Sequence, residues 1–228
     1  MGGVMKLTFL GHSAILLEHA GGRVLVDPFL TGNPNAAVAA DAVEADVIVL
    51  THAHGDHVGD TVAIAKRTGA VVVSNVEIAG RLAREGIETI GANTGGRVVL
   101  PVGAVTFTAA WHSSSFDDGG YGGLAMGAVI EIGGRRVYHA GDTALFGDMA
   151  LIARGGLDLA LLPIGDHFTM GPADAVEAVK LLRPSRVVPI HYGTFPPIEQ
   201  DAEAFRDAVQ DATDAVAHAL APGEVIEF

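Results

Sequence analysis

The chain has 228 residues, a formal net charge of −13 and a mean hydropathy of +0.37. The acidic balance and the lack of a Lys/Arg cluster in the sequence argue against a nucleic-acid-binding protein, because such proteins present a basic face to phosphates. The chain has no cysteine, so disulfides are excluded and any metal ion must be bound by histidine and carboxylate side chains.

Short apolar runs bounded by Gly, Asp or Pro recur along the chain and predict β-strands. They are Val4–Leu10, Ala14–Glu18, Val24–Val26, Val47–Leu50, Val71–Val73, Val105–Ala109, Ala128–Ile132, Val137–His139, Leu157–Pro163, Val187–Ile190 and Val225–Phe228. Helical patterns lie between them. They are Asp60–Thr68, Val76–Glu85, Pro172–Leu182 and Gln200–Leu220. This mixture predicts a layered α/β sandwich.

The overall organisation and location follow from what the sequence lacks. No apolar stretch approaches the roughly 20 residues that span a bilayer, and no basic segment followed by an apolar run opens the chain. We therefore expect a cytoplasmic protein without a membrane partner. No linker, low-complexity segment or short repeat interrupts the sequence, so we expect a single domain over residues 1–228.

Potential metal ligands follow several predicted strands directly. Four of them come after one strand, within six residues: His52, His54, Asp56 and His57. Three more follow later strands singly: His112, Asp142 and His191. Because strand ends in a layered fold can converge at one edge, we expect these side chains to meet there. Neutral imidazole and carboxylate groups bind Zn²⁺ and similar divalent ions, so the set predicts a metal site.

The residues alone leave open whether this set binds one ion or two. Four potential ligands within six residues can crowd one cation or divide between two, and a carboxylate can also bridge two ions. Gly55 would let the loop curl tightly around the ions. A chance occurrence of this His-x-His-x-Asp-His pattern has odds of roughly one in a thousand, so the motif indicates a metal centre specifically.

The motifs of the chain resemble those of the metallo-β-lactamase superfamily. The segment Thr51–His57 is similar to the signature of that fold, and Trp111–Ser115, His139–Thr143 and Pro189–Phe195 match later motifs in the same order. The opening segments FLGHSAILLE and VLVDPFLTGNP are similar to a branch of metal-dependent hydrolases related to L-ascorbate-6-phosphate lactonase. The resemblance covers nearly the whole chain.

The resemblance implies a four-layer αββα sandwich of the metallo-β-lactamase type with two internally similar halves. It also implies two divalent metal ions, zinc first, with manganese, iron or nickel as alternatives. The implied ligands of the first ion are His52, His54 and His112. Those of the second are Asp56, His57 and His191, and Asp142 would bridge the two ions. A hydroxide that bridges the ions would attack the substrate, with one ion polarising the substrate oxygen.

Further residues are candidates for catalysis or support. Besides Asp56 and Asp142, the catalytic candidates are His12 and His167, each of which could contact the substrate or transfer a proton; structural hydrogen bonding is the alternative for both. Asp27 could accept a hydrogen bond from a metal-bound imidazole or simply start an Asp-Pro turn. The serines at 113–115 are expected in turns and caps rather than as nucleophiles.

The expected substrate is a small ester, lactone or amide. The loops that carry the motifs contain no Lys or Arg, whereas recognition of phosphate usually recruits them. Three alternatives stay open: a phosphodiesterase or nuclease on the same fold, a mononuclear-iron sulfur dioxygenase, and a non-catalytic metal-binding protein. The expected partner is a small molecule and not a nucleic acid, and the sequence also allows a homo-oligomer.

Overall fold

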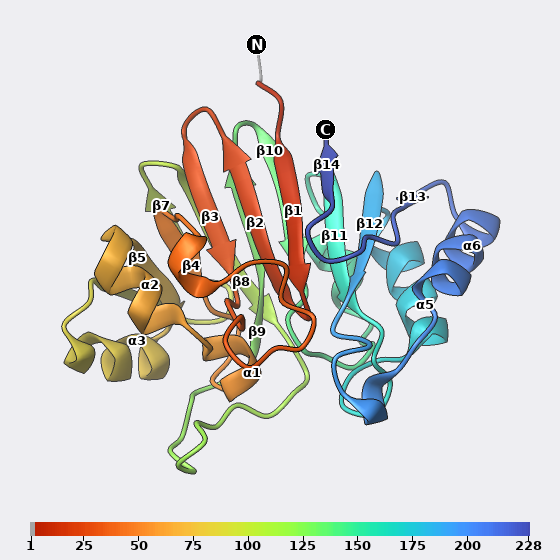
Figure 1. The fold of residues 1–228 in the computed structure, drawn as a ribbon. Coiled ribbons are helices and arrows are strands. Elements are labelled where there is room, and N and C mark those ends of the chain that lie inside the picture. The colour runs from red at the N-terminus through yellow and green to blue at the C-terminus, as the bar shows by residue number, and fades with distance from the viewer. Residues whose placement is uncertain (1–2) are drawn as a thin grey trace.

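Two seven-stranded sheets pack face to face in the computed structural model, which describes residues 3–228 (Figure 1). Sheet A has, in spatial order, β14 (Val225–Glu227), β1 (Lys6–Gly11), β2 (Ala14–His19), β3 (Gly22–Val26), β4 (Val47–Val49), β5 (Val71–Asn75) and β6 (Thr89–Ala92). Sheet B has β13 (Val216–Ala217), β12 (Arg186–Ile190), β11 (Leu159–Pro163), β10 (Arg135–His139), β9 (Met126–Ile132), β8 (Gly103–Ala109) and β7 (Arg97–Leu100).

Helices cover the outer faces of both sheets. Beside sheet A lie α1 (Gly55–Val58), α2 (Thr61–Thr68) and α3 (Val76–Leu82), and beside sheet B lie α4 (Met149–Ile152), α5 (Pro172–Leu182) and α6 (Ala202–Ala212) (Figure 1). Three short 3₁₀ helices complete the connections: η1 (Ala40–Ala42), η2 (Ala83–Glu85) and η3 (Pro196–Ile198). The result is the predicted four-layer αββα sandwich.

Burial on both faces explains why the central strands are almost continuously apolar. The core between the sheets includes Leu7 and Phe9 of β1 and Leu161 of β11. The opposite faces pack against helices, as Ile48 of β4 does beside Ile64 of α2. Strands buried in this way position the loops at their ends rigidly.

The direction of the strands determines where the functional loops lie. In sheet A, β3, β4, β5 and β6 run parallel, and in sheet B, β10, β11, β12 and β13 run parallel. The carboxyl ends of parallel strands lie at one edge of a sheet. Both sheets turn this edge to the same side of the sandwich, the lower side in Figure 1, where α1 also lies.

The structure corrects the prediction at the last helix. A single helix was expected over Gln200–Leu220, but α6 ends at Ala212 and the chain then forms β13. The backbone N–H of Val216 donates to the carbonyl of Ser185 and that of His218 to Val187. Pairing with the edge of sheet B therefore overrides a helical spacing of alanines, which indicated a longer helix.

Two strands, β6 and β7, were not predicted at all. Each has only four residues and each lies at the edge of its sheet. Their side chains are mostly half-buried or exposed; β6 lacks the apolar run that marks the central strands, whereas β7 contains the short apolar run Val98–Leu100. Within the described residues 3–228, no helix is long and apolar enough to cross a membrane.

Candidate metal centre

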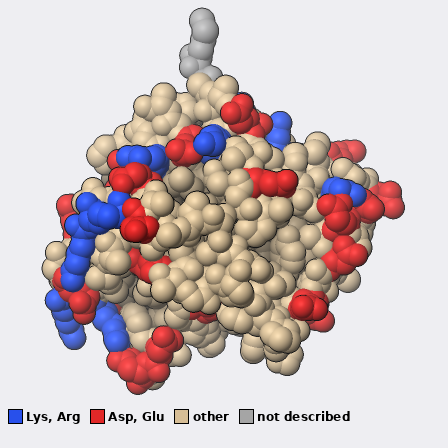
Figure 2. All heavy atoms as spheres, viewed as in Figure 1, with Lys and Arg blue, Asp and Glu red and all other residues tan. Residues whose placement is uncertain are grey.

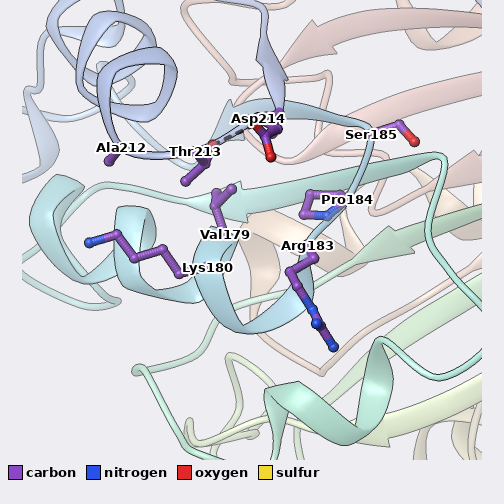
Figure 3. A pocket seen from close by; sticks show the side chains of 9 residues that line it. Val179, Lys180, Arg183, Pro184, Ser185, Ala212, Thr213 and Asp214 are labelled. Atoms are coloured by element: carbon purple, nitrogen blue, oxygen red, sulfur yellow. Dashed lines mark hydrogen bonds between the residues drawn. The ribbon is translucent and has the colours of Figure 1, made fainter.

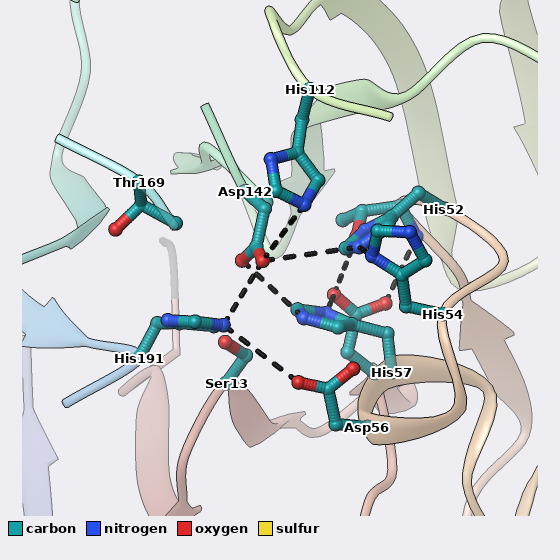
Figure 4. Close-up of polar contacts among 12 residues, drawn as sticks. Ser13, His52, His54, Asp56, His57, His112, Asp142, Thr169 and His191 are labelled. Carbon is teal, nitrogen blue, oxygen red and sulfur yellow. Dashed lines mark hydrogen bonds and ion pairs between the residues drawn. The ribbon is translucent and has the colours of Figure 1, made fainter. Parts of the chain in front are cut away.

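Seven potential metal ligands meet at the edge where the parallel strands end (Figure 4). Sheet A contributes four of them, from the loop after β4 and from α1: His52, His54, Asp56 and His57. Sheet B contributes one from the loop after each of three strands, β8, β10 and β12: His112, Asp142 and His191. The structure therefore brings together all seven side chains that the sequence indicated.

Two glycines allow the ligand loop to pack tightly. A Cβ atom on Gly55 would lie 2.7 Å from a carboxylate oxygen of Asp117, and one on Gly59 would lie 2.4 Å from the carbonyl oxygen of Pro28. Gly59 also has a φ of +40°, which disfavours residues with a side chain. These positions let α1 sit against two neighbouring loops, and this contact fixes the direction of Asp56 and His57.

One group of ligand atoms belongs to His52, His54 and His112, and these atoms lie within 4.8 Å of one another. The Nε2 atom of His52 is 3.0 Å from Nδ1 of His54. Two nitrogens bound to one tetrahedral zinc at about 2.0 Å would lie about 3.3 Å apart. The spacing of these imidazoles therefore fits a shared ion.

A second group comprises Asp56, His57 and His191, joined by His12. Oδ2 of Asp56 is 3.8 Å from Nε2 of His191 and 3.1 Å from Nε2 of His12. The other nitrogen of the buried His12 ring lies 2.8 Å from Oγ1 of Thr194. Both ring nitrogens of His12 thus have polar partners, and His12 holds the carboxylate of Asp56 in place. His167 lies in neither group of potential ligands.

Asp142 stands between the two groups (Figure 4). Its Oδ2 atom is 3.5 Å from Nε2 of His112, 3.9 Å from Nε2 of His52 and 3.0 Å from Nε2 of His191. Its Oδ1 atom is 3.3 Å from Nε2 of His57. One carboxylate therefore faces ligands of both groups.

Unpartnered polar atoms support a cation at this place. Nε2 of His57 and Oδ1 of Asp142 are buried, and neither has a hydrogen-bond partner among the residues that the structure describes. Buried polar atoms are almost always satisfied, so atoms without a partner require an explanation. A divalent ion is the partner that imidazole and carboxylate share, and the donor set therefore fits metal binding.

A buried carboxylate orients His57 from behind. Oδ2 of Asp27 lies 2.8 Å from Nδ1 of His57 and accepts a hydrogen bond of 2.6 Å from the hydroxyl of Thr51. Its Oδ1 accepts the backbone N–H of Thr51 at 2.9 Å. Nδ1–H of His57 then donates to Asp27, which leaves Nε2 directed at Asp142. Of the two roles considered for Asp27, the geometry favours the support of a ligand.

Unusual backbone conformations cluster around this centre. Of the five non-glycine residues with a positive φ angle within residues 3–228, four lie in loops at the ligand edge: His12 (57°), Asp27 (44°), Asp166 (67°) and His191 (54°); the fifth, Arg183, follows the end of α5. Such conformations cost free energy in residues other than glycine, and the surrounding structure must impose them. The loops are therefore held in place to direct these side chains.

The electrostatics of the two groups differ. Burial lowers the pKa of His52, His54 and His112, so these imidazoles are neutral at pH 7. Burial also acts to lower the pKa of His57, but the carboxylates of Asp142 and Asp27 outweigh it and raise that pKa well above its ordinary value. The second group thus attracts a positive charge strongly, and a metal ion can supply it in place of a proton.

A cavity of about 340 Å³ opens onto the ligands. Its walls are formed by five of the potential ligands together with Ser113 and Phe168. His167 is exposed and is absent from these walls, although its ring packs edge-on against Phe168 with centroids 4.6 Å apart. Ser114 fixes the neighbouring loop by donating to the carbonyl of Gly122 at 2.9 Å, in line with the turn role expected for these serines.

A larger cavity of about 550 Å³ lies at the opposite edge, between the ends of α5 and α6 (Figure 3). Its charged residues are Lys180, Arg183 and Asp214. It contains no group of potential metal ligands, so the smaller cavity is the one associated with metal chemistry.

Three threonines support the site without having been predicted: Thr51, Thr143 and Thr194. Thr143 accepts the backbone N–H of Trp111 on its hydroxyl and that of Met170 on its carbonyl, each at 2.9 Å. Thr143 follows Asp142 directly in the chain, so these two hydrogen bonds hold the loops after β8 and β11 next to Asp142. The only signal for these threonines was their position next to predicted ligands or within a motif segment.

Comparison with known proteins identifies relatives along the whole chain. A family model described as a beta-lactamase superfamily domain matches residues 22–192. A UPF0173 metal-dependent hydrolase of Thermus thermophilus is 56% identical over 225 residues, which cover 99% of this chain and 100% of the relative. A UPF0173 metal-dependent hydrolase of Thermococcus onnurineus is 53% identical over 230 residues, with coverage of 99% and 100%. The solved structure of a metallo hydrolase from the archaeon Ignicoccus hospitalis is similar with a TM-score of 0.91 at 42% identity, and the match covers 99% of this chain and 98% of that one.

Proposed function

Since the chain belongs to the beta-lactamase superfamily and is a metal-dependent hydrolase, we propose that it binds two divalent metal ions, zinc first, and hydrolyses a small ester, lactone or amide. The observation that carries the proposal is Asp142, whose carboxylate faces both groups of potential ligands: Oδ2 lies near His112 and His191, and Oδ1 lies near His57. Seven ligand side chains exceed the four that one tetrahedral ion takes. Two ions in these positions would activate water and polarise the substrate carbonyl.

The residues of the chain have distinct roles in this proposal. His52, His54 and His112 hold the first ion, and Asp56, His57 and His191 hold the second. Together with the shared Asp142, each set would supply four protein ligands, so water or substrate would bind as a fifth ligand of the ion. Asp142 would be a ligand of both ions, because it lies between the two sets.

Two supporting groups fix the second set. Asp27 keeps Nε2 of His57 directed at the site, and His12 holds the carboxylate of Asp56 from a buried position. We assign His12 a positioning role, because both of its ring nitrogens already have partners. Burial lowers the pKa of His12 to about 4, so it stays neutral at pH 7 and donates a hydrogen bond to Asp56.

His167 is proposed as the residue that donates a proton to the leaving group. It follows β11 at the ligand edge and stands beside Phe168, which forms part of the cavity wall. Its ring is exposed and makes no side-chain hydrogen bond within residues 3–228, so its nitrogens are available to a substrate. Imidazole transfers protons readily near neutral pH.

The preference for an uncharged substrate follows from the charges around the cavity. None of the seven residues of its wall is Lys or Arg. Arg81 lies nearby in α3, but both of its terminal nitrogens donate to Asp118, at 3.0 and 2.7 Å. The exposed Asp117 lies beside Gly55 at the ligand loop and would repel an anion.

The test is a substrate panel on protein of known metal content. Protein stripped by a chelator and reloaded in turn with Zn²⁺, Mn²⁺, Fe²⁺ or Ni²⁺ is assayed against esters, lactones, amides and phosphodiesters. We expect turnover of a carbonyl substrate, loss of that turnover on stripping, and its return on reloading. Turnover of phosphodiesters alone would refute the substrate class, and activity that survives complete stripping would refute the metal dependence.

A further inference from the structure

Phe168 is the one apolar residue among the seven that line the metal cavity. The other six are His54, Asp56, His112, Ser113, Asp142 and His191. The phenylalanine side chain is 55% exposed, whereas Ile164 and Met170 on either side of it in the loop are buried. An exposed aromatic ring beside potential metal ligands is a surface that a ligand can cover, with a gain from apolar burial.

The loop that carries Phe168 is fixed at both ends. The backbone N–H of Met170 donates to the carbonyl of Thr143 at 2.9 Å, and that of Asp166 donates to Met170 at 3.2 Å. A Cβ atom on Gly165 would lie 2.4 Å from the carbonyl oxygen of His191, so this loop packs directly on the backbone of a ligand. The ring is therefore presented by a firm support, which reduces the entropic cost of binding against it.

One neighbour of the ring is defined by an aromatic contact. His167 packs against it at an interplanar angle of 89°. Phe168 also lines the cavity and is 55% exposed. Edge-to-face contact of this kind is favourable and restrains the ring.

The size and charge of the cavity restrict what can cover the ring. A volume of about 340 Å³ is near the lower end of ligand cavities, which range from about 300 to 1,000 Å³. Two exposed carboxylates, Asp117 and Asp166, lie in the loops that surround the site, and the wall has no cation. Figure 2 shows that lysine and arginine gather mainly toward the side of α2 and α3 on the displayed face.

We infer that Phe168 binds the apolar part of the substrate, so that the substrate is a small uncharged carbonyl compound with an alkyl or aryl group next to the scissile bond. The inference rests on the proposed function, because it takes the metal ligands as the place where the carbonyl group binds. Phe168 is in this view the residue that determines specificity, and it takes no part in the bond-breaking step.

The test uses alkanohydroxamic acids, which carry a metal-binding head and an apolar tail of chosen length. Dissociation constants of the acetyl to hexanoyl members are measured by calorimetry on metal-loaded protein. In the wild type we expect the affinity to rise about two- to fourfold for each added methylene, which approaches the gain for burying that group. In Phe168→Ala this dependence on length should flatten to less than about 1.5-fold per methylene.

A matched control and a conservative variant complete the test. Leu151 is 52% exposed on α4 and lies outside the wall of the metal cavity, so Leu151→Ala should keep the wild-type dependence on tail length. Phe168→Leu should restore part of the dependence, since leucine still offers an apolar surface. Unchanged metal content and unchanged affinity for acetohydroxamic acid would show that Phe168→Ala leaves the fold and the ions intact.

The outcomes separate this inference from the proposed function. Wild-type protein that binds acetohydroxamic acid but gains nothing from longer tails would overturn the role of Phe168 and leave the metal centre standing. An unchanged dependence on length in Phe168→Ala would overturn it equally. Failure of metal-loaded protein to bind even the acetyl compound would overturn the metal-centred function, and the present inference with it.

Discussion

The two sheets contribute to the metal centre in different ways. Sheet A supplies four potential ligands from one short stretch, residues 52–57, whereas sheet B supplies one potential ligand from each of three separate strand ends. Each proposed ion nevertheless takes ligands from both sheets: His112 joins the first group and His191 the second. The proposed centre therefore lies between the two sheets, and neither sheet alone supplies the potential ligands of both proposed ions.

The support behind the ligands is also unequal. Behind the sheet A stretch, Asp27 is fully buried and accepts three hydrogen bonds, from Thr51 and His57. On the side of sheet B, Asp142 depends on the loop that Thr143 and His139 hold, the latter through Nε2–H and the carbonyl of Ser13 at 3.0 Å. The comparison predicts that removing a shared ligand of sheet B does more damage than removing a support of sheet A.

The largest effect is expected from Asp142→Ala, which removes the sheet B carboxylate that both groups share. Turnover should fall by about 10⁴-fold or more, the loss typical of residues that act as one catalytic unit. His54→Ala should also abolish nearly all hydrolysis, and the double variant should be little worse than either single one. Steady-state kinetics at saturating metal measures this, and Asp148→Ala, an exposed carboxylate six residues away, is the control. Wild-type turnover in Asp142→Ala would rule out the shared ligand.

A somewhat smaller effect is expected from His167→Ala, which leaves both ligand groups intact. Metal content should stay unchanged while turnover falls by roughly 10²–10⁴-fold, the usual contribution of a general acid or base. His167→Gln, which keeps a hydrogen-bond donor but cannot transfer a proton, separates proton donation from simple contact. Metal analysis and kinetics are done together, with His19→Ala at the opposite edge as control. Lost metal would make His167 part of the metal site, and unchanged turnover would remove it from the mechanism.

Asp27→Ala should have a more modest effect, because it removes only the support of one ligand. The affinity for metal, measured by competition with a chelator, should fall by about 10- to 100-fold. Asp46→Ala is the matched control, since Asp46 is an exposed carboxylate at the other end of the same sheet. Unaltered metal affinity would mean that Asp27 only forms a turn and that sheet A needs no such support.

The smallest effect concerns nucleic acid. With a net charge of −13 and no Lys or Arg in the cavity wall, the protein should not bind RNA or DNA usefully at physiological salt. A salt titration of RNA binding by fluorescence anisotropy checks this expectation. Tight binding with a steep dependence on salt would revive the nuclease alternative.

The same contrast between the sheets explains what could be predicted from the sequence. The four potential ligands of sheet A lie within six residues of one another along the chain, so their spacing alone indicated a metal site. His112 and His191 are single residues after apolar runs, and only the convergence of strand ends, together with the family motifs, made them candidates. The αββα sandwich was predicted because its central strands are buried on both faces and read as apolar runs.

What could not be predicted depends on contacts between distant segments. The short edge strands β6, β7 and β13 each depend on pairing with a neighbouring strand. The positioning role of His12 depends on Thr194, which is 182 residues away along the chain. The place of Phe168 in the cavity wall could not be predicted, because a single aromatic residue in a loop forms no sequence pattern.

The most direct test of the central claim is the number of metal ions that one chain binds. Native mass spectrometry of purified protein saturated with Zn²⁺ measures this number without reference to any substrate. Ligands from both sheets, with Asp142 between them, predict two ions per chain. Saturation at one ion per chain would contradict the account.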